Sequence, residues 1–190
     1  MDKILKRLES LHPKIIDLKL DRVKRLLGKL GNPERLLPPV IHVAGTNGKG
    51  STASIIAKIL QNSGQSVGLY TSPHLINFNE RIRINGVPIS DDDIISFTKT
   101  YRDFFEKQSI TFFEATTAMA FDYFRKNEID IAIVETGLGG RLDSTNVLSP
   151  IHTIITEIDF DHTHLLGETV EEITAEKCGI IKNVTPNTTI

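Results

Sequence analysis

The sequence is poor in cysteine and in long apolar runs, and it has no strong excess of either charge. Its single cysteine, Cys178, excludes an internal disulfide and suits a reducing compartment. The longest apolar runs are far too short to span a bilayer, and residues 1–3 do not begin a secretory signal. A net charge of −2 without a basic cluster argues against nucleic acid as the main partner. We therefore expect a cytoplasmic globular protein that binds neither membranes nor nucleic acids.

The 190 residues are enough for one ordinary domain with a buried core. Two stretches near the beginning carry leucines at helical spacing, one over residues 1–11 and one over residues 20–30. Between them, residues 12–18 contain proline and aspartate, which predicts an irregular connector. We interpret residues 1–39 as a helical lead-in to a core of strands and helices over residues 40–190.

The clearest chemical signal lies between an apolar run, Val40–Ala44, and a stretch with helical spacing that begins at Ala53. Between them, glycines alternate with Thr and Asn, and one Lys and two hydroxyl residues follow. Glycines let backbone N–H groups face a ligand, and the N-terminus of the next helix favours negative charge. This pattern predicts a strand, a phosphate-binding loop and a helix. The candidate nucleotide-binding residues are Thr46, Asn47, Gly48, Lys49, Gly50 and Ser51.

The loop departs from the strict Walker A pattern, in which four residues separate the first glycine from Gly-Lys-Ser/Thr. Here Gly45 lies three residues before Gly48, and Gly50 separates Lys49 from Ser51. The physical parts nevertheless remain, because Lys49 can neutralise phosphate and a hydroxyl can lie near Mg²⁺. A strand-to-helix turn without a ligand would explain one or two glycines, but not a lysine among three of them.

Further apolar runs at residues 67–70, 131–134 and 151–158 predict additional strands. A strand, a helix and a strand in close succession imply a right-handed parallel crossover. The remaining segments contain turn and helix-capping signals. They predict a small hairpin over residues 81–89 and helices over residues 90–107, 113–125 and 169–179.

Ligands of parallel sheets lie beyond the carboxyl ends of the strands, so the residues after each strand are candidates for a site. They are Thr71–His74, Glu135 with the glycine loop 137–140, and Asp159–His164. Glu135 can hold Mg²⁺ beside the phosphate loop, as a Walker B acid does. The two aspartates and two histidines of 159–164 are compatible with a magnesium site, a zinc site or a hydrogen-bonded loop.

Six motifs, taken together, resemble those of folylpolyglutamate synthase/dihydrofolate synthase, a family of the Mur ligase superfamily. They occur in the family's order at Gly45–Ser51, Thr71–Leu75, Asn79–Arg83, Glu135–Asp143, Asp161–Thr163 and Glu176–Lys177. The resemblance implies an α/β fold with a P-loop-type parallel sheet flanked by helices. It also implies an ADP-forming ligase, in which ATP phosphorylates the carboxylate of folate or dihydropteroate and the amine of L-glutamate displaces the phosphate.

The resemblance also implies roles for individual residues. Lys49, His162 and Lys177 match catalytic positions, and Lys49 would stabilise the transferred charge. Ser72, Glu135, His162 and Lys177 match the family's Mg²⁺ positions, where the family carbamylates the lysine and so turns a cation into an oxygen ligand. The implied wall of the pterin site consists of Ile16, Asp17, Leu18, Thr111, Phe112, Phe113, Leu142, Asp143 and Ser144.

The family's chains are considerably longer than this one. By resemblance, the chain is an N-terminal part of the ATP-binding domain, incomplete at its C-terminal end and without a C-terminal domain. We expect a monomer that cannot complete the ligation alone. A non-catalytic nucleotide- or pterin-binding module, a muramyl-peptide ligase and an unrelated P-loop kinase are the alternatives. Only 39 residues precede Val40, which is short for the first domain of a muramyl-peptide ligase, and Gly50 disfavours the kinase.

Overall fold

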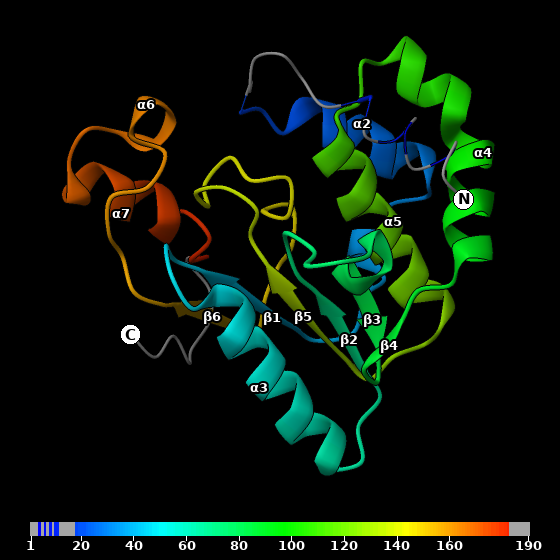
Figure 1. The fold of residues 1–190 in the computed structure, drawn as a ribbon, viewed down its shortest axis with the longest axis horizontal. Helices are drawn as coiled ribbons and strands as arrows, with labels where there is room; N and C mark the ends of the chain where they lie inside the picture. The colour runs from blue at the N-terminus through cyan, green and yellow to red at the C-terminus, as the bar shows by residue number, and fades with distance from the viewer. Residues whose placement is uncertain (1–3, 5, 7, 9, 12–17, 183–190) are drawn as a thin grey trace.

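The computed structural model describes residues 4, 6, 8, 10, 11 and 18–182. Its centre is a six-stranded sheet in the order β4-β3-β2-β5-β1-β6 (Figure 1). Strands β2, β5, β1 and β6 are parallel, and the hairpin of β3 and β4 extends the sheet with antiparallel pairing. The strands are β1 (Val40–Ala44), β2 (Val67–Tyr70), β3 (Ile82–Ile84), β4 (Val87–Pro88), β5 (Ile131–Glu135) and β6 (His152–Ile155). The predicted parallel sheet is thus confirmed in strands β2, β5, β1 and β6.

Helices cover both faces of this sheet (Figure 1). One face packs against α3, and the other packs against α5 together with α2 and α4. Helices α6 and α7 follow β6 and contact each other. The elements are α2 (Asp21–Lys29), α3 (Lys49–Asn62), α4 (Asp91–Lys107), α5 (Phe112–Lys126), α6 (Thr163–Leu166) and α7 (Val170–Cys178), with 3₁₀ helices η1 (Pro33–Arg35) and η2 (Phe78–Arg81).

The pleat of the central strands divides the core into two clusters. In β5, Ile131 and Ile133 belong to the cluster on the α3 face, whereas Ala132 and Val134 belong to the cluster on the α5 face. This alternation follows from the two-residue period of a strand. A strand that is apolar on both faces is therefore buried on both faces, which is the arrangement that its continuous apolar run predicts.

The predicted helix boundaries agree with the structure where the capping signals are strong. Ser90 accepts a hydrogen bond from the backbone N–H of Asp93 at the start of α4, and Thr169 accepts one from Glu172 at the start of α7. The predicted connector over residues 12–18 lies outside the described residues except for Leu18. Of the described helices, none combines the length and the apolar character needed to cross a bilayer.

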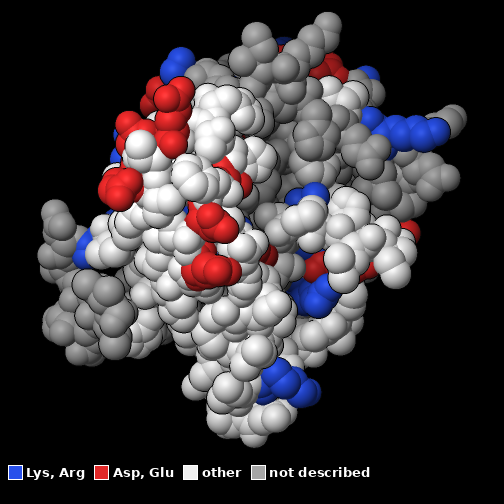
Figure 2. Space-filling model, turned by 60° about the vertical axis from the view of Figure 1, so that its left-hand side comes forward, with Lys and Arg blue, Asp and Glu red and all other residues white. Residues whose placement is uncertain are grey.

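Charged side chains are unevenly spread over the face drawn in Figure 2. On the face drawn in Figure 2, acidic side chains gather in patches while basic side chains occur at isolated places among uncharged residues. No extended basic surface is visible on the described part of that face.

Gly68 of β2 lies where a side chain cannot be accommodated without movement. A Cβ at this position would lie 2.5 Å from Ile129 Cδ1 and 2.9 Å from Phe124 Cδ1. We expect Gly68→Ala to lower the free energy of unfolding by about 1–3 kcal/mol, because overpacking strains a dense core. Urea denaturation monitored by circular dichroism measures the change.

The matched control is Gly28→Ala on the exposed side of α2, where a Cβ would meet no atom closer than 4.0 Å. This variant should be neutral or more stable by up to about 1 kcal/mol, because alanine favours a helix. Equal stability of the Gly68→Ala variant and the unsubstituted chain would contradict the packing described for β2.

Candidate active site

The loop from Gly45 to Gly48 connects β1 to the N-terminus of α3 and has the geometry of a phosphate-binding turn. Gly45 and Gly48 have φ angles of 145° and 82°, which side-chain-bearing residues rarely adopt. A Cβ on Gly45 would also collide with the hydroxyl of Thr156. Both glycines are therefore required by the backbone path that leaves the N-terminus of α3 free for an anion.

Hydrogen bonds to the segment after β6 hold this loop in place. Two of them come from the side chains of Thr46 and Asn47 in the loop. The Thr46 hydroxyl lies 3.0 Å from the carbonyl oxygen of Asp159, and Asn47 donates to the Glu157 carboxylate at 3.3 Å. Thr156 donates to the Asn47 carbonyl at 2.7 Å. The strand predicted over residues 151–158 ends at Ile155, so that prediction was too long. Beyond Ile155, the backbone pairs with the phosphate loop at an isolated bridge between Glu157 and Asn47. The nucleotide contacts of Thr46 and Asn47 stay predictions.

The ammonium group of Lys49 lies over the loop itself. It donates to the carbonyl oxygens of Gly45 and Thr46, at 2.9 Å and 3.0 Å. Burial lowers the pKa of Lys49, whereas the nearby Glu135 carboxylate acts in the opposite direction. The lysine thus lies at the turn, close to the carboxylate that the sequence predicts to hold Mg²⁺ beside the phosphate loop.

Glu135 ends β5 and is almost completely buried. Its Oε2 accepts the backbone N–H of Ser72 at 3.0 Å, and a Cβ on Gly50 would lie 3.3 Å from the same oxygen. Burial raises the pKa of Glu135, and the bond from Ser72 and the charge of Lys49 oppose that rise. The fold therefore brings together the tips of β1, β2 and β5, as the rule for parallel sheets predicts.

Lys177 and Asp161 join the same region from the other side. The buried ammonium of Lys177 donates to the Gly45 carbonyl at 2.9 Å and to the Asp161 carboxylate at 2.7 Å. His162 Nε2 lies 3.6 Å from the second oxygen of Asp161. These contacts suit an ammonium group, and the carbamylation that the resemblance implies stays a prediction. Asp161 belongs to the predicted cluster of residues 159–164, but its ion pair with Lys177 was not predicted.

The described residues contain no group of three or more His, Cys, Asp or Glu side chains that could hold a metal ion. The zinc interpretation of residues 159–164 therefore finds no support in the described structure. Mg²⁺ commonly uses one or two carboxylates together with substrate phosphates and water. The buried Glu135 carboxylate beside Gly50 and Lys49 fits that kind of site, and the metal roles of Ser72, His162 and Lys177 stay predictions.

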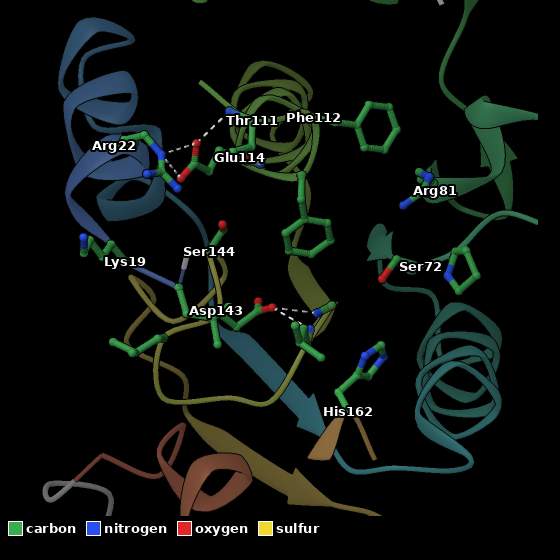
Figure 3. A pocket seen from close by; sticks show the side chains of 16 residues that line it. Lys19, Arg22, Ser72, Arg81, Thr111, Phe112, Glu114, Asp143, Ser144 and His162 are labelled. Carbon is green, nitrogen blue, oxygen red and sulfur yellow. Dashed lines mark hydrogen bonds and ion pairs between the residues drawn. The ribbon is translucent and has the colours of Figure 1, made fainter. Parts of the chain in front are cut away.

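A cavity of about 320 Å³ opens beside these groups, between α2, the N-terminus of α5 and the loop that follows β5 (Figure 3). Its volume is in the range of small-molecule sites. The described residues predicted for the pterin wall all line it: Leu18, Thr111, Phe112, Phe113, Leu142, Asp143 and Ser144. Ile16 and Asp17 lie outside the described residues. Ser72 and His162 line the same cavity at the side of the phosphate loop.

Four charged residues of the cavity wall were not predicted from the sequence. They are Lys19, Arg22, Arg81 and Glu114. Arg22 Nε contacts the two carboxylate oxygens of Glu114 at 2.9 Å and 3.2 Å, which links α2 to α5. Glu114 also closes a capping box with Thr111. The Thr-x-x-Glu spacing was a usable signal for that box, but nothing local indicated the contact with Arg22.

The carboxylate of Asp143 is buried in the cavity wall and holds the loop after β5. Its Oδ2 accepts the backbone N–H groups of Gly137 and Leu138 at 2.9 Å and 2.8 Å (Figure 3). Its Oδ1 accepts both the N–H and the hydroxyl of Thr145. Burial raises the pKa of Asp143, and these bonds oppose the rise. The structure thus gives Asp143 a supporting role, and its direct contact with a substrate stays a prediction.

His42 supports Thr145 from the centre of β1. Its Nε2 lies 2.8 Å from the Thr145 hydroxyl, and its Nδ1 is buried without a partner in the described structure. Because the hydroxyl donates to Asp143, the bond from His42 is assigned to an Nε2–H donor. Burial is the main cause that lowers the pKa of His42 from 6.5 to about 3, and the charge of Lys182 adds to it.

This buried histidine predicts a loss of stability in mild acid. The unfolded chain takes up a proton at residue 42 near pH 6.5 and the folded chain only near pH 3, so acid favours the unfolded state between these values. The expected loss at this site between pH 7 and pH 5 is about 2 kcal/mol. His42→Gln keeps a donor for Thr145 but cannot titrate. Urea denaturation at both pH values should show a smaller loss for the variant, and equal losses would contradict a neutral His42.

Comparison with known proteins identifies the family. The chain matches the family model of the Mur ligase middle domain over residues 43–190. It is 49% identical over 174 residues to the dihydrofolate synthase/folylpolyglutamate synthase of Bacillus subtilis, covering 88% of this chain and 40% of that protein. It is 44% identical over 172 residues to the folylpolyglutamate synthase of Lacticaseibacillus casei, covering 87% of this chain and 40% of that protein.

Solved structures give the same result. A structure described as an FPGS-AMPPCP-folate complex matches with a TM-score of 0.90 and 40% identity, covering 99% of this chain and 48% of that chain. Escherichia coli FolC in complex with DHPP and ADP matches with a TM-score of 0.87 and 39% identity, covering 97% of this chain and 44% of that chain. This chain thus spans less than half the length of these relatives.

The matched family model includes the phosphate loop, the tip of β5 and the helix that carries Lys177. The resemblance that the six sequence motifs indicate is confirmed by the high identity to folylpolyglutamate and dihydrofolate synthases. By sequence and by fold, the chain belongs to the Mur ligase family.

Proposed function

We propose that the chain is the nucleotide- and pterin-binding part of an ATP-dependent ligase that adds L-glutamate to folate, to dihydropteroate or to both. One observation carries this proposal. Ser72 lines the cavity, the N–H of Ser72 donates to Glu135, and Glu135 lies beside Gly50 of the phosphate loop. A carboxylate at the end of a ligand in the cavity would therefore lie next to the phosphates of a bound nucleotide.

The chemistry requires this proximity because a carboxylate is a poor electrophile. A carboxylate oxygen attacks the γ-phosphorus of ATP, the bond to the bridging oxygen breaks, and ADP leaves. The amine of glutamate then attacks the carbonyl carbon of the acyl phosphate, loses a proton and expels inorganic phosphate. Positioning and neutralisation of charge provide most of the catalysis in phosphoryl transfer. The turn at Gly45–Gly48 would position the phosphates, and the ammonium of Lys49 would neutralise part of their charge.

The comparisons support these substrates by analogy. One structural neighbour is described with an ATP analogue and folate, and another with DHPP and ADP. Mg²⁺ would accompany the nucleotide, held by Glu135 and phosphate oxygens, and would neutralise part of the triphosphate charge. L-glutamate as the second substrate, a monomeric state and a cytoplasmic location belong to the same proposal.

Oxygen-18 in the substrate carboxylate tests this function. The proposed reaction moves one carboxylate oxygen into the acyl phosphate and then into inorganic phosphate. A full-length ligase containing this chain should therefore release phosphate that carries the label, detected by mass spectrometry. Release of unlabelled phosphate with amide formation would contradict an acyl phosphate, and phosphate release without an amide product would indicate a simple ATPase.

A further inference from the structure

Arg81 is a buried cation in the cavity wall that none of the roles described above uses. It ends η2, just before β3, and is only 8% exposed. Figure 3 shows its guanidinium on the side of the cavity where Ser72 lies. Arginine is seldom buried without a partner, so the surroundings of this side chain indicate what it binds.

Two neutral groups fix the orientation of Arg81. Its Nε donates to His74 Nδ1 at 2.9 Å, and its Cζ lies 5.2 Å from the centroid of the Phe112 ring. The His74 ring accepts through Nδ1, and the Phe112 ring offers a cation–π contact. Both interactions hold the guanidinium in place, but neither supplies a negative charge.

The two terminal amino groups of Arg81 form no hydrogen bond or ion pair with the part of the chain that the structure describes. The other arginine of the cavity differs, because Arg22 is neutralised by a close pair with Glu114. Burial lowers the pKa of Arg81, whereas the charges of Tyr70 and Glu135 act in the opposite direction. Arg81 therefore presents a charged guanidinium at the cavity, and its two terminal amino groups have no hydrogen-bond partner among the described residues.

The position of Arg81 relates it to the phosphate loop. Ser72 lines the cavity with Arg81 and contacts Glu135, which lies beside Gly50. An anion at Arg81 thus lies at the end of the cavity nearest to the phosphate loop. Two parallel N–H groups of a guanidinium match the two oxygens of a carboxylate.

We propose that Arg81 binds the carboxylate of the pteroyl substrate, with its two terminal amino groups, at the end of the cavity next to the phosphate loop. The inference rests on the proposed function, in which the cavity takes folate or dihydropteroate. Arg81 then offsets the repulsion between the carboxylate and the triphosphate, and it selects acids over uncharged pteroyl compounds.

Binding of two ligands to this chain tests the proposal. Isothermal titration calorimetry compares pteroate with its methyl ester, which cannot form the paired bonds to a guanidinium. The unsubstituted chain should prefer the acid by about 10- to 100-fold, the range for hydrogen bonds to charged groups. Arg81→Gln should lose this preference and bind the ester as before. The matched control is Arg83→Gln, because Arg83 lies two residues along, pairs with Glu80 at 3.9 Å and does not line the cavity. It should keep the full preference.

Binding of ADP and the melting temperature show that each variant is folded. If Arg81→Gln fails these controls, Arg81→Lys replaces it, and its preference for the acid should be reduced because lysine lacks the fork. Equal binding of acid and ester to the unsubstituted chain would overturn the role of Arg81 and leave the proposed function intact. A full preference for the acid in a folded Arg81 variant would likewise overturn the role of Arg81 and leave the proposed function intact. Binding of neither ligand to the unsubstituted chain would overturn both proposals.

Discussion

Replacing Lys49 with alanine is expected to abolish formation of the acyl phosphate. The ammonium lies over the Gly45 and Thr46 carbonyls at the N-terminus of α3, where charge would develop in the proposed phosphoryl transfer. Loss of one such electrostatic contact costs about 100- to 1,000-fold, and Lys49 carries a full charge, so we expect a loss at the upper end or beyond. Hydroxylamine trapping of the acyl phosphate in a full-length ligase containing this chain measures the effect.

The control for this substitution lies on the same helix. Lys58 is exposed on α3 and contacts neither the loop nor the cavity, so Lys58→Ala should retain activity. Folding of both variants is compared by their melting temperatures. If Lys49→Ala forms the trapped acyl phosphate at the same rate as the unsubstituted ligase, the phosphate loop has no role in phosphoryl transfer.

Replacing Glu135 with glutamine should have the second large effect. Glutamine keeps an acceptor for the Ser72 N–H but loses the buried charge that fits Mg²⁺. We expect kcat to fall by about 100- to 1,000-fold, the size of effect seen when one preorganised electrostatic contact is lost. Titration of Mg²⁺ at saturating ATP measures both kcat and the metal requirement, which should shift to higher Mg²⁺ concentrations.

Glu157 supplies the matched control for this prediction. It is exposed, and its carboxylate accepts a hydrogen bond from Asn47 of the phosphate loop at 3.3 Å, while its carbonyl oxygen accepts the N–H of Thr46 at 2.7 Å. Glu157→Gln should therefore change the Mg²⁺ requirement little. An unchanged Mg²⁺ titration in Glu135→Gln would mean that this carboxylate does not face the metal.

The sequence was sufficient for features whose signals are local. The turn at Asn85 and Gly86 was predictable because both residues adopt positive φ, 52° and 79°, as tight hairpins require. The caps at Ser90 and Thr169 depend on residues three positions away. The parallel arrangement of β1, β2 and β5 followed from apolar runs joined by helices, and it was enough to bring Lys49, Ser72 and Glu135 together.

Features that depend on distant contacts were not predictable in this way. Arg22 and Glu114 are 92 residues apart, and neither local pattern indicates the other. The direction of Arg81 depends on His74 and on Phe112 of another helix. The resemblance implies a pterin-site role for Asp143, which lines the cavity, but only the folded loop shows its carboxylate accepting backbone N–H groups of that loop.

The most direct test of the proposed ligase is the dependence of ADP formation on both acceptor and amine. A full-length ligase containing this chain is incubated with ATP and Mg²⁺, with and without folate or dihydropteroate, and with and without L-glutamate. We predict that sustained ADP release requires an acid substrate and glutamate together, and that each ADP accompanies one new amide bond. Sustained ADP release in the absence of both would contradict the proposed function.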